Sequence, residues 1–221
     1  MVRQGGCGVA SKGVRVLAVA DVVSPVIHSE AFPDNLPPFD LVLSAGDMPG
    51  EVLEFIATKT KVPPLYVMGN HGVGLLREKN GETPYRRPGG CIDAHLKYVE
   101  VAGVTVLGVE GSARYRDGPF QYREPEYAMM LARLTPRLLY ERSRRGRAVD
   151  VLLTHAPPVG PSAGEDFAHR GVPAFNAFHR RWRPLVHVHG HVHLEGGGPR
   201  EHVTPEGVRV VNAFGYTLID L

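Results

Sequence analysis

The stretch Val14-Arg15-Val16-Leu17-Ala18-Val19-Ala20 is typical of a buried β-strand, because apolar residues fill it almost without interruption. Asp21 follows directly, at the carboxyl end of the predicted strand. The same arrangement returns twice: residues 41–45 end at Gly46-Asp47, and residues 65–68 end at Gly69-Asn70-His71. Three strands that each end in polar side chains predict a sheet with candidate ligands along one edge.

The segments between these strands indicate how they are connected. Residues 51–59 follow Pro49 and have the apolar spacing of a helix, with Val52, Leu53, Phe55 and Ile56 on one face. Repeated strand–crossover–strand units give a mostly parallel sheet with helices on its faces. The pattern therefore predicts an α/β fold.

The remainder of the chain is less regular. Residues 98–101 and 104–109 predict a hairpin, and residues 124–145 predict a helix that Pro136 kinks or breaks. Two further strands, 149–153 and 185–189, end at Thr154-His155 and at Gly190-His191-Val192-His193. Residues 208–212 and 216–220 are expected to close the chain as antiparallel strands, whereas 72–95 and 157–183 read as irregular insertions.

The composition fits one domain over residues 1–221, with 1–13 as a flexible N-terminal segment. Hydrophobic residues make up 43%, which is enough for a sizeable core. The formal net charge of +2 argues against a general nucleic-acid or polybasic membrane binder. Two cysteines make no disulfide framework, and neither a signal peptide nor a membrane span is apparent, so a cytoplasmic location is expected.

The polar residues at the strand ends point to metal chemistry. Aspartate, asparagine and histidine supply oxygen and nitrogen ligands to divalent first-row metals. A carboxylate with two oxygens can bridge two cations, which would polarise a phosphoryl group and convert water into hydroxide near neutral pH. A histidine beside such ligands could protonate the leaving oxygen.

The order of these motifs resembles that of the calcineurin-like metallophosphoesterase superfamily, in which Asp-x-His, Gly-Asp, Gly-Asn-His, a lone His and Gly-His-x-His follow one another. The resemblance extends from Asp21 to His193. It implies a two-sheet αββα sandwich, with mixed sheets and helices on the outer faces, and a hydrolase with two metal ions. It also implies that Asp47 bridges both metals, that Asn70, His155 and His191 complete one site, that Asp21 and His193 serve the other, and that His71 is the general acid.

Two positions depart from the family pattern. Val23 stands where the first motif has a histidine ligand, so one metal site lacks a ligand; it could bind weakly, take an extra water or recruit another side chain such as His28. Gly72 follows His71 where the family usually has an acidic residue that orients this histidine, and its loss would slow proton donation. These departures permit a slow or unusual enzyme, or a non-catalytic descendant.

Other polar residues have both a structural and a functional interpretation. His187 and His189 are expected in the core or behind the ligands. Asp166, His169 and Arg170 are further candidates for contacting substrate, as are Arg86-Arg87 and Arg114-Tyr115-Arg116, although solvated loops explain them equally well. The arginines at 142, 144, 145 and 147 lie near a predicted helix end, where positive charge is favourable, and are expected to be structural.

The sequence therefore predicts a cytoplasmic phosphoesterase that hydrolyses a phosphomonoester or phosphodiester by metal-bound hydroxide. Manganese, iron or zinc would suit the mixed ligands, with one of the two sites weakened. The expected partner is a small phosphoester rather than a membrane or a nucleic acid, and the oligomeric state is left open. The alternative is a metal-binding scaffold or regulatory protein with little or no turnover. The near-neutral charge disfavours a nuclease of the same superfamily.

Overall fold

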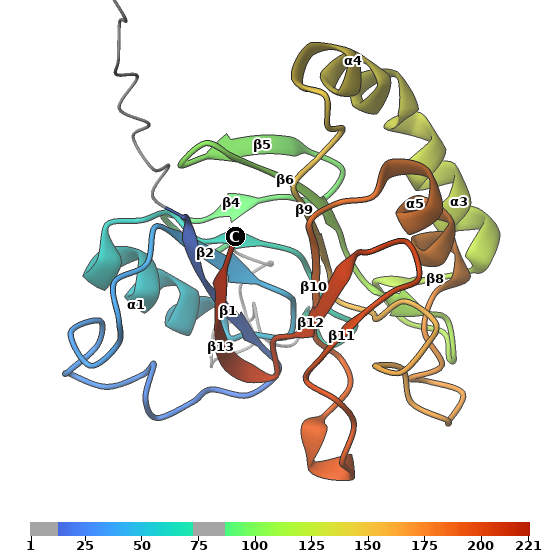
Figure 1. Cartoon of the computed structure of the whole chain (residues 1–221). Helices are drawn as coiled ribbons and strands as arrows, with labels where there is room; N and C mark the ends of the chain where they lie inside the picture. The colour runs from blue at the N-terminus through green and yellow to red at the C-terminus, as the bar shows by residue number, and fades with distance from the viewer. Residues whose placement is uncertain (1–12, 73–86) are drawn as a thin grey trace, which may run out of the picture.

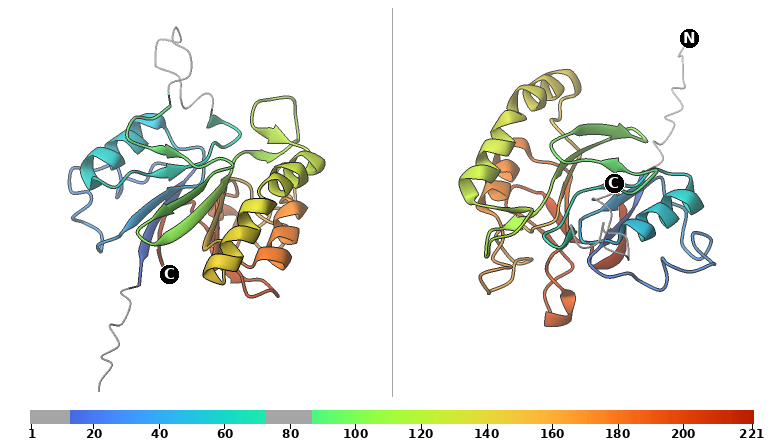
Figure 2. Two further views of the ribbon diagram at one scale, coloured as in Figure 1. Left: turned by 90° about the horizontal axis from the view of Figure 1, so that it is seen from above. Right: turned by 180° about the vertical axis from the view of Figure 1, so that it is seen from behind.

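The computed structural model describes residues 13–72 and 87–221 (Figure 1). The predicted flexible segment 1–13 lies almost entirely outside the described residues, as does most of the predicted insertion 72–95. Two sheets pack face to face, and helices cover their outer sides (Figures 1 and 2). Among the described residues, no helix has both the length and the apolar composition needed to cross a membrane.

The first sheet contains five strands in the order β13-β1-β2-β3-β4. Strands β1 to β4 run parallel, and β13 pairs with β1 in the antiparallel direction. Helix α1 (Gly50–Thr60) covers the outer face and buries Val52, Leu53 and Ile56, as the sequence predicts. The strands are β1 (Arg15–Ala20), β2 (Leu41–Ser44), β3 (Leu65–Tyr66), β4 (Ile92–Asp93) and β13 (Gly215–Asp220).

The second sheet contains six strands in the order β11-β12-β10-β9-β6-β5. The four central strands run parallel to one another, whereas β11 and β5 are antiparallel edges. Its strands are β5 (Tyr98–Val101), β6 (Val104–Val109), β9 (Val151–Thr154), β10 (Val186–His189), β11 (Glu201–Val203) and β12 (Arg209–Asn212). The outer helices are α3 (Glu124–Arg133), α4 (Thr135–Arg145) and α5 (Pro173–Trp182), and the short strands β7 (Ser112–Ala113) and β8 (Gln121–Tyr122) form a separate pair.

Alternate residues of one strand serve different layers. In β1, Val16 and Ala18 lie in the apolar cluster between the sheets, whereas Leu17 lies in the cluster beneath α1. In β9, Leu153 faces the first sheet and Leu152 packs under the helices. Because both faces of each sheet are covered, its strands are apolar at nearly every position. The αββα sandwich implied by the sequence is therefore confirmed.

The predicted helix over 124–145 is divided into two. Helix α3 ends at Arg133, and α4 begins at Thr135 with Pro136 in its first turn. Proline has no backbone N–H and cannot continue the hydrogen-bond ladder of a preceding helix, so Pro136 is tolerated only near a helix start. The predicted break at this proline is confirmed.

The second insertion contains a helix that the sequence analysis does not predict. Residues 157–183 read as irregular, but α5 occupies Pro173–Trp182. Phe175, Phe178 and Trp182 are buried at the three- and four-residue spacing of an amphipathic helix. The expectation was wrong because the glycines and prolines before this stripe dominate the composition of the segment.

The last two strands lie in different sheets. Strand β12 pairs with β10 in the second sheet, and the chain then crosses so that β13 pairs with β1 in the first sheet. Strand β12 is antiparallel to β11, and β13 is antiparallel to β1, but β12 and β13 do not pair with each other. The chain end therefore helps to join the two halves of the sandwich.

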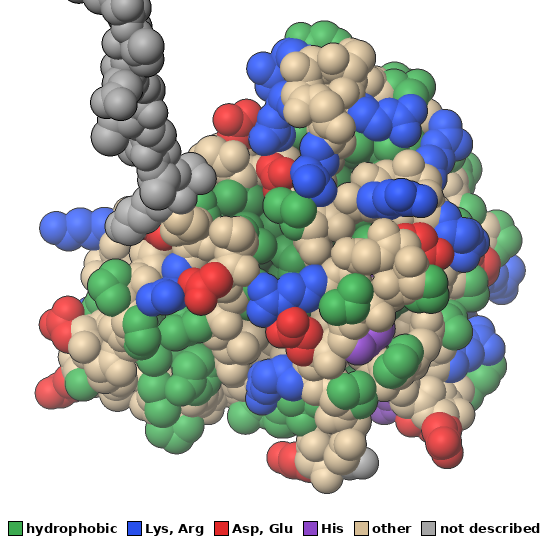
Figure 3. Space-filling view, viewed as in Figure 1, with side chains coloured by type: hydrophobic (Ala, Val, Ile, Leu, Met, Phe, Trp, Pro, Cys, Tyr) green, Lys and Arg blue, Asp and Glu red, His purple; other side chains and the backbone are tan. Residues whose placement is uncertain are grey.

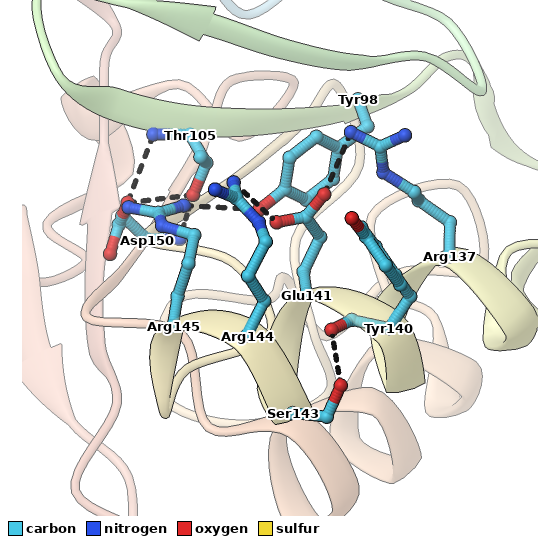
Figure 4. A network of polar contacts seen from close by, with 9 residues as sticks. All are labelled: Tyr98, Thr105, Arg137, Tyr140, Glu141, Ser143, Arg144, Arg145 and Asp150. Carbon is cyan, nitrogen blue, oxygen red and sulfur yellow. Dashed lines mark hydrogen bonds and ion pairs between the residues drawn. The ribbon is translucent and has the colours of Figure 1, made fainter.

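Ion pairs lie within α4, and Arg145 joins this helix to the second sheet (Figure 4). Glu141 is fully buried and pairs with Arg137 at 2.7 Å and with Arg144 at 3.1 Å. Arg145 donates to the Asp150 carboxylate and to the Tyr98 hydroxyl, each at 3.1 Å. Basic side chains gather over α4 in Figure 3. Within the arginine cluster at 142–147, Arg144 and Arg145 contact other groups of the protein, as the structural interpretation predicts.

Candidate metal centre

Candidate ligands follow the ends of strands from both sheets. Asp21, Asp47 and Asn70 come after β1, β2 and β3 of the first sheet. His155 and His191 come after β9 and β10 of the second sheet. The strands within each set are parallel, so their carboxyl ends meet at one edge of the sandwich, where ligands of α/β sheets bind.

Asp21, Asp47 and His155 form the centre of this group. Each offers one ligand atom within 4.8 Å of the others. His155 Nε2 lies 3.2 Å from Asp47 Oδ2 and 2.9 Å from Asn70 Oδ1. The Asn70 amide nitrogen donates to the Tyr115 hydroxyl at 3.0 Å, which keeps the amide oxygen turned toward His155.

The hydrogen bonds of His155 leave one ring nitrogen for a cation. Nδ1 lies 2.8 Å from the Ala45 carbonyl oxygen, which can only accept, so Nδ1 carries a proton. In the neutral ring, Nε2 then carries a lone pair that faces the oxygens of Asp47 and Asn70, and these oxygens are also hydrogen-bond acceptors. A divalent metal satisfies such converging acceptors, and a carbonyl on the other ring N–H is the usual support of a histidine ligand. The residues present therefore fit a metal ion.

Charge couples the members of this group. Burial lowers the pKa of His155, but the hydrogen bond and the charge of Asp47 outweigh burial and raise the pKa above its ordinary value. For Asp47 the two effects have the opposite sign: burial raises the pKa of this carboxyl, but its interactions with His155 lower that pKa on balance. Burial is the main cause of the raised pKa of Asp21. A divalent cation would offset the same negative charges that now favour a proton on His155.

The backbone around these ligands is strained. Asp21, Asp47 and His191 have φ angles of 65°, 53° and 68°, in the left-handed region that side chains rarely occupy. Gly46 has a φ of 96°, and a Cβ there would lie 2.5 Å from His155 Nδ1. A Cβ at Gly69 would overlap the Asp47 carboxylate. Such strain clusters at functional sites. The left-handed backbone at Gly46 and the close approach of Asp47 to Gly69 explain why glycine precedes both Asp47 and Asn70.

His191 is buried beside the central group and is held by a loop. Its backbone N–H donates to the Asp21 carboxylate at 3.0 Å, and its Nε2–H donates to the Ala168 carbonyl at 3.0 Å. Nδ1 of the neutral ring is therefore the atom that remains for a cation. Burial and the nearby His155 lower the pKa of His191 to about 3, so its ring is neutral at physiological pH.

His71 and His193 lie at the exposed rim of the group. The backbone N–H of His71 donates to Asp47 Oδ1 at 3.0 Å, and its ring makes no hydrogen bond to another described residue. His193 lies against Phe214, with ring centroids 4.6 Å apart, and its charge acts on Asp21. Both predicted residues are thus near the centre without joining the compact group of Asp21, Asp47 and His155.

The positions that depart from the family pattern have apolar surroundings. Val23 is half-buried against the apolar cluster beneath α1 and offers no ligand atom. His28 is exposed and lies 5.0 Å from the Phe55 ring of α1 in an edge-on contact, rather than in the compact group. A Cβ at Gly72 would lie 2.5 Å from Met68 Cε, so a side chain there would displace Met68.

The loop that holds His191 contains the other candidates. His169 Nδ1 lies 2.7 Å from Asp166 Oδ2, and the His169 ring lies 4.7 Å from the His191 ring. The hydrogen bond from His169 is the main cause of the lowered pKa of Asp166. Arg170 stacks on Phe167, with its guanidinium carbon 4.2 Å from the ring centre. The structure thus brings His169 to the centre and leaves Arg170 beside it.

Sequence reasoning missed the partners that orient the ligands. The carbonyls of Ala45 and Ala168 fix the rings of His155 and His191, but backbone oxygens carry no sequence signal. In the sequence, Tyr115 stands out only through its flanking arginines, yet its hydroxyl contacts Asn70. Arg86 lies outside the described residues, and Arg87 pairs with Asp93 at 3.0 Å.

A family model described as calcineurin-like phosphoesterase matches residues 14–195. Metallophosphoesterase domain-containing protein 1 from Homo sapiens is 28% identical over 203 residues, covering 77% of this chain and 59% of its own length. A UPF0046 protein from Caenorhabditis elegans is 27% identical over 203 residues, covering 83% of this chain and 65% of its own length. The chain thus spans less than two thirds of either relative.

A solved structure shares the fold. The crystal structure of TT1561 of Thermus thermophilus superposes with a TM-score of 0.61 at 15% sequence identity, covering 95% of each chain. At this identity the likeness concerns the arrangement of the strands and helices.

Proposed function

The chain belongs to the calcineurin-like phosphoesterase family, and from this premise we propose that it hydrolyses a small phosphomonoester or phosphodiester at a pair of divalent metal ions. The observation that supports this most directly is the convergence of Asp21, Asp47 and His155 within 4.8 Å, with Asn70 Oδ1 2.9 Å from His155 Nε2. These side chains are oxygen and nitrogen donors and suit manganese, iron or zinc.

Each ligand has a role in this proposal. Asp47 would serve both sites: one of its carboxylate oxygens lies 3.2 Å from His155 Nε2, and the other accepts the His71 backbone N–H. Asn70, His155 and His191 would complete one site, and Asp21 and His193 would serve the other. When bound, divalent cations supply the Lewis acidity and the activated water that phosphoester hydrolysis requires.

The remaining residues would position the substrate and protonate its leaving oxygen. His71 is exposed at the rim of the centre. The hydrogen bond from its backbone N–H to Asp47 fixes the position of the His71 backbone, from which the ring extends. A ring nitrogen of His71 would donate a proton to the leaving oxygen. The loop over 164–170 would cover one side of the substrate, because Ala168 and His169 already contact His191.

A metal-binding scaffold with little turnover is the second candidate. Val23 packs in an apolar cluster and supplies no ligand, so the site of Asp21 and His193 has one donor fewer than the family pattern. The His71 ring also lacks a hydrogen-bonded carboxylate among the described residues. Both features would reduce turnover more than they reduce binding of one ion at Asn70, His155 and His191.

Turnover and metal content separate the two candidates. An aryl phosphate and an aryl phosphodiester are assayed with added Mn²⁺ for the wild type, Asp47→Asn, His155→Ala and the exposed control Asp34→Asn. We expect the first two variants to lose hydrolysis and bound metal, and the control to retain both. Tight binding of one ion without hydrolysis of either ester would favour the scaffold. Wild-type activity in Asp47→Asn would contradict the proposed site.

A further inference from the structure

A pocket of about 310 Å³ lies between α3, the β7–β8 pair and the segment that leads into α5. Its walls include Ala113, Tyr127 and Val172, which are buried in the core under the outer helices. The pocket is therefore built into the packing of the domain. Such a cavity accommodates an apolar or aromatic group without rearrangement of the backbone.

Three arginines line the same pocket: Arg114, Arg123 and Arg170. Arg114 is paired with Asp117. Arg123 and Arg170 form no ion pair with another described residue, and the Arg170 guanidinium carbon lies 4.2 Å from the centre of the Phe167 ring. The guanidinium groups are suited to a carboxylate or a phosphate, which they bind with paired N–H donors.

The one carboxylate among the lining residues, Glu124, offsets only part of this charge. Glu124 accepts a hydrogen bond from the backbone N–H of Ala174, in the first turn of α5. Its negative charge acts on the start of that helix, where it is favourable, and on Arg170, so one carboxylate faces the two arginines that form no ion pair. Positive charge remains in excess around an otherwise apolar cavity.

Two chain segments connect this pocket to the metal centre. Arg170 directly follows His169, whose ring lies 4.7 Å from that of His191. Arg114 directly precedes Tyr115, whose hydroxyl accepts from Asn70 at 3.0 Å. Two lining residues of the pocket are thus each one residue away in sequence from a side chain that contacts a candidate ligand.

We propose that this pocket is a specificity subsite for phosphoesters whose leaving group is aromatic or apolar and carries a second anionic group. The inference rests on the proposed function, because it assigns the scissile phosphate to the metal centre. The apolar body would fill the cavity, and the second anion would meet Arg123 and Arg170. Phosphoesters with a neutral leaving group would bind without this contact.

The test uses a matched pair of substrates, phenyl phosphate and meta-carboxymethyl phenyl phosphate, with Mn²⁺. The methylene group keeps the leaving phenols similar, so a difference in kcat/KM reports the second anion. We expect the anionic substrate to be preferred, and Arg123→Met and Arg170→Met each to reduce that preference about tenfold, the loss of one charge-assisted hydrogen bond. Arg133→Met, an exposed residue at the far end of α3, is the control and should retain the preference.

Binding is measured separately from turnover by calorimetry with the non-hydrolysable benzylphosphonate and its meta-carboxymethyl derivative. A preference for the derivative that Arg123→Met and Arg170→Met lose would support the subsite, even if neither ester is hydrolysed and the proposed function fails. Hydrolysis of both esters with equal kcat/KM, or equal affinity for the two phosphonates, would overturn the subsite and leave the proposed function standing.

Discussion

A chain of buried histidines makes the stability of the fold dependent on pH. The Thr154 hydroxyl donates to the Ala156 carbonyl at 2.6 Å, so Thr154 Oγ1 must accept from His187 Nε2–H at 2.7 Å. His187 Nδ1 then accepts from His179 Nε2–H at 2.9 Å. His179 Nδ1 is left with a lone pair that has no partner among the described residues. This chain of donors requires neutral rings.

The magnitude follows from the pKa of His179. Burial is the main cause that lowers this pKa from 6.5 to about 4 in the folded protein. Between these two values the unfolded chain binds a proton that the folded chain does not, so the free energy of unfolding falls as the pH falls. Full stability is present above pH 6.5, and the loss from this one group reaches about 2 kcal/mol at pH 5.

Replacing His179 removes this dependence. We expect His179→Phe to be destabilised by about 1 kcal/mol at pH 7.5, because it loses the hydrogen bond to His187. At pH 5 the variant should be more stable than the wild type by about 1 kcal/mol, a change of about 2 kcal/mol in the difference between them. His189 is present in both proteins and makes no hydrogen bond to His179, so its own titration largely cancels.

Urea unfolding followed by the fluorescence of Trp182, the single tryptophan, measures both proteins, because Trp182 is buried on the same helix. Phe178→Leu is the control: it truncates a buried, non-titrating neighbour on α5 and should cost about the same at both pH values. If the stability difference between His179→Phe and wild type does not change from pH 7.5 to pH 5, the claim that these histidines are buried as neutral rings is refuted.

Three further substitutions test the site and its support. Gly69→Ala places a Cβ against the Asp47 carboxylate and should weaken Mn²⁺ binding about tenfold in calorimetry with little change in melting temperature; unchanged affinity would contradict the close approach. Asp166→Asn loosens the loop that orients His191, so metal affinity should fall about tenfold, whereas the exposed neighbour control Glu165→Gln should match wild type. Glu141→Gln removes the buried charge that two arginines share and should lower the urea-unfolding free energy by about 1 kcal/mol; no change would show that the two pairs make no net contribution to stability.

Much of the fold could be predicted because its strands are covered on both faces. Alternating residues such as Val16 and Leu17 enter different apolar clusters, so β1 reads as an apolar run that ends abruptly at Asp21. The stripe of Phe175, Phe178 and Trp182 carried an equally clear helical signal for α5. It was missed because the residues before it have the composition of a loop. Local pattern thus identifies an element, but a neighbouring segment of different composition can mask it.

The local sequence does not show which of the two sheets each C-terminal strand joins. Strands β12 and β13 are close neighbours in the sequence, yet they belong to different sheets because the chain crosses between them near Phe214, which bridges to Ala20. The pairing of His179 with His187 depends on how α5 packs against β10, which also involves long-range geometry. Sequence could therefore identify these residues but not their partners.

The candidate ligands could be predicted as a set because their motifs keep their order, but their orientation depends on contacts between motifs. The Asp21 carboxylate, from the first sheet, accepts the backbone N–H of His191, from the second, and Asp47 accepts that of His71. One oxygen of Asp47 is thereby fixed by the backbone while the other faces His155. Left-handed backbone at Asp21, Asp47 and His191 is tolerable because buried strands precede all three. The strain and the cross-sheet bonds act together, so the rigidity of the sandwich, rather than any single motif, sets the distances at the centre.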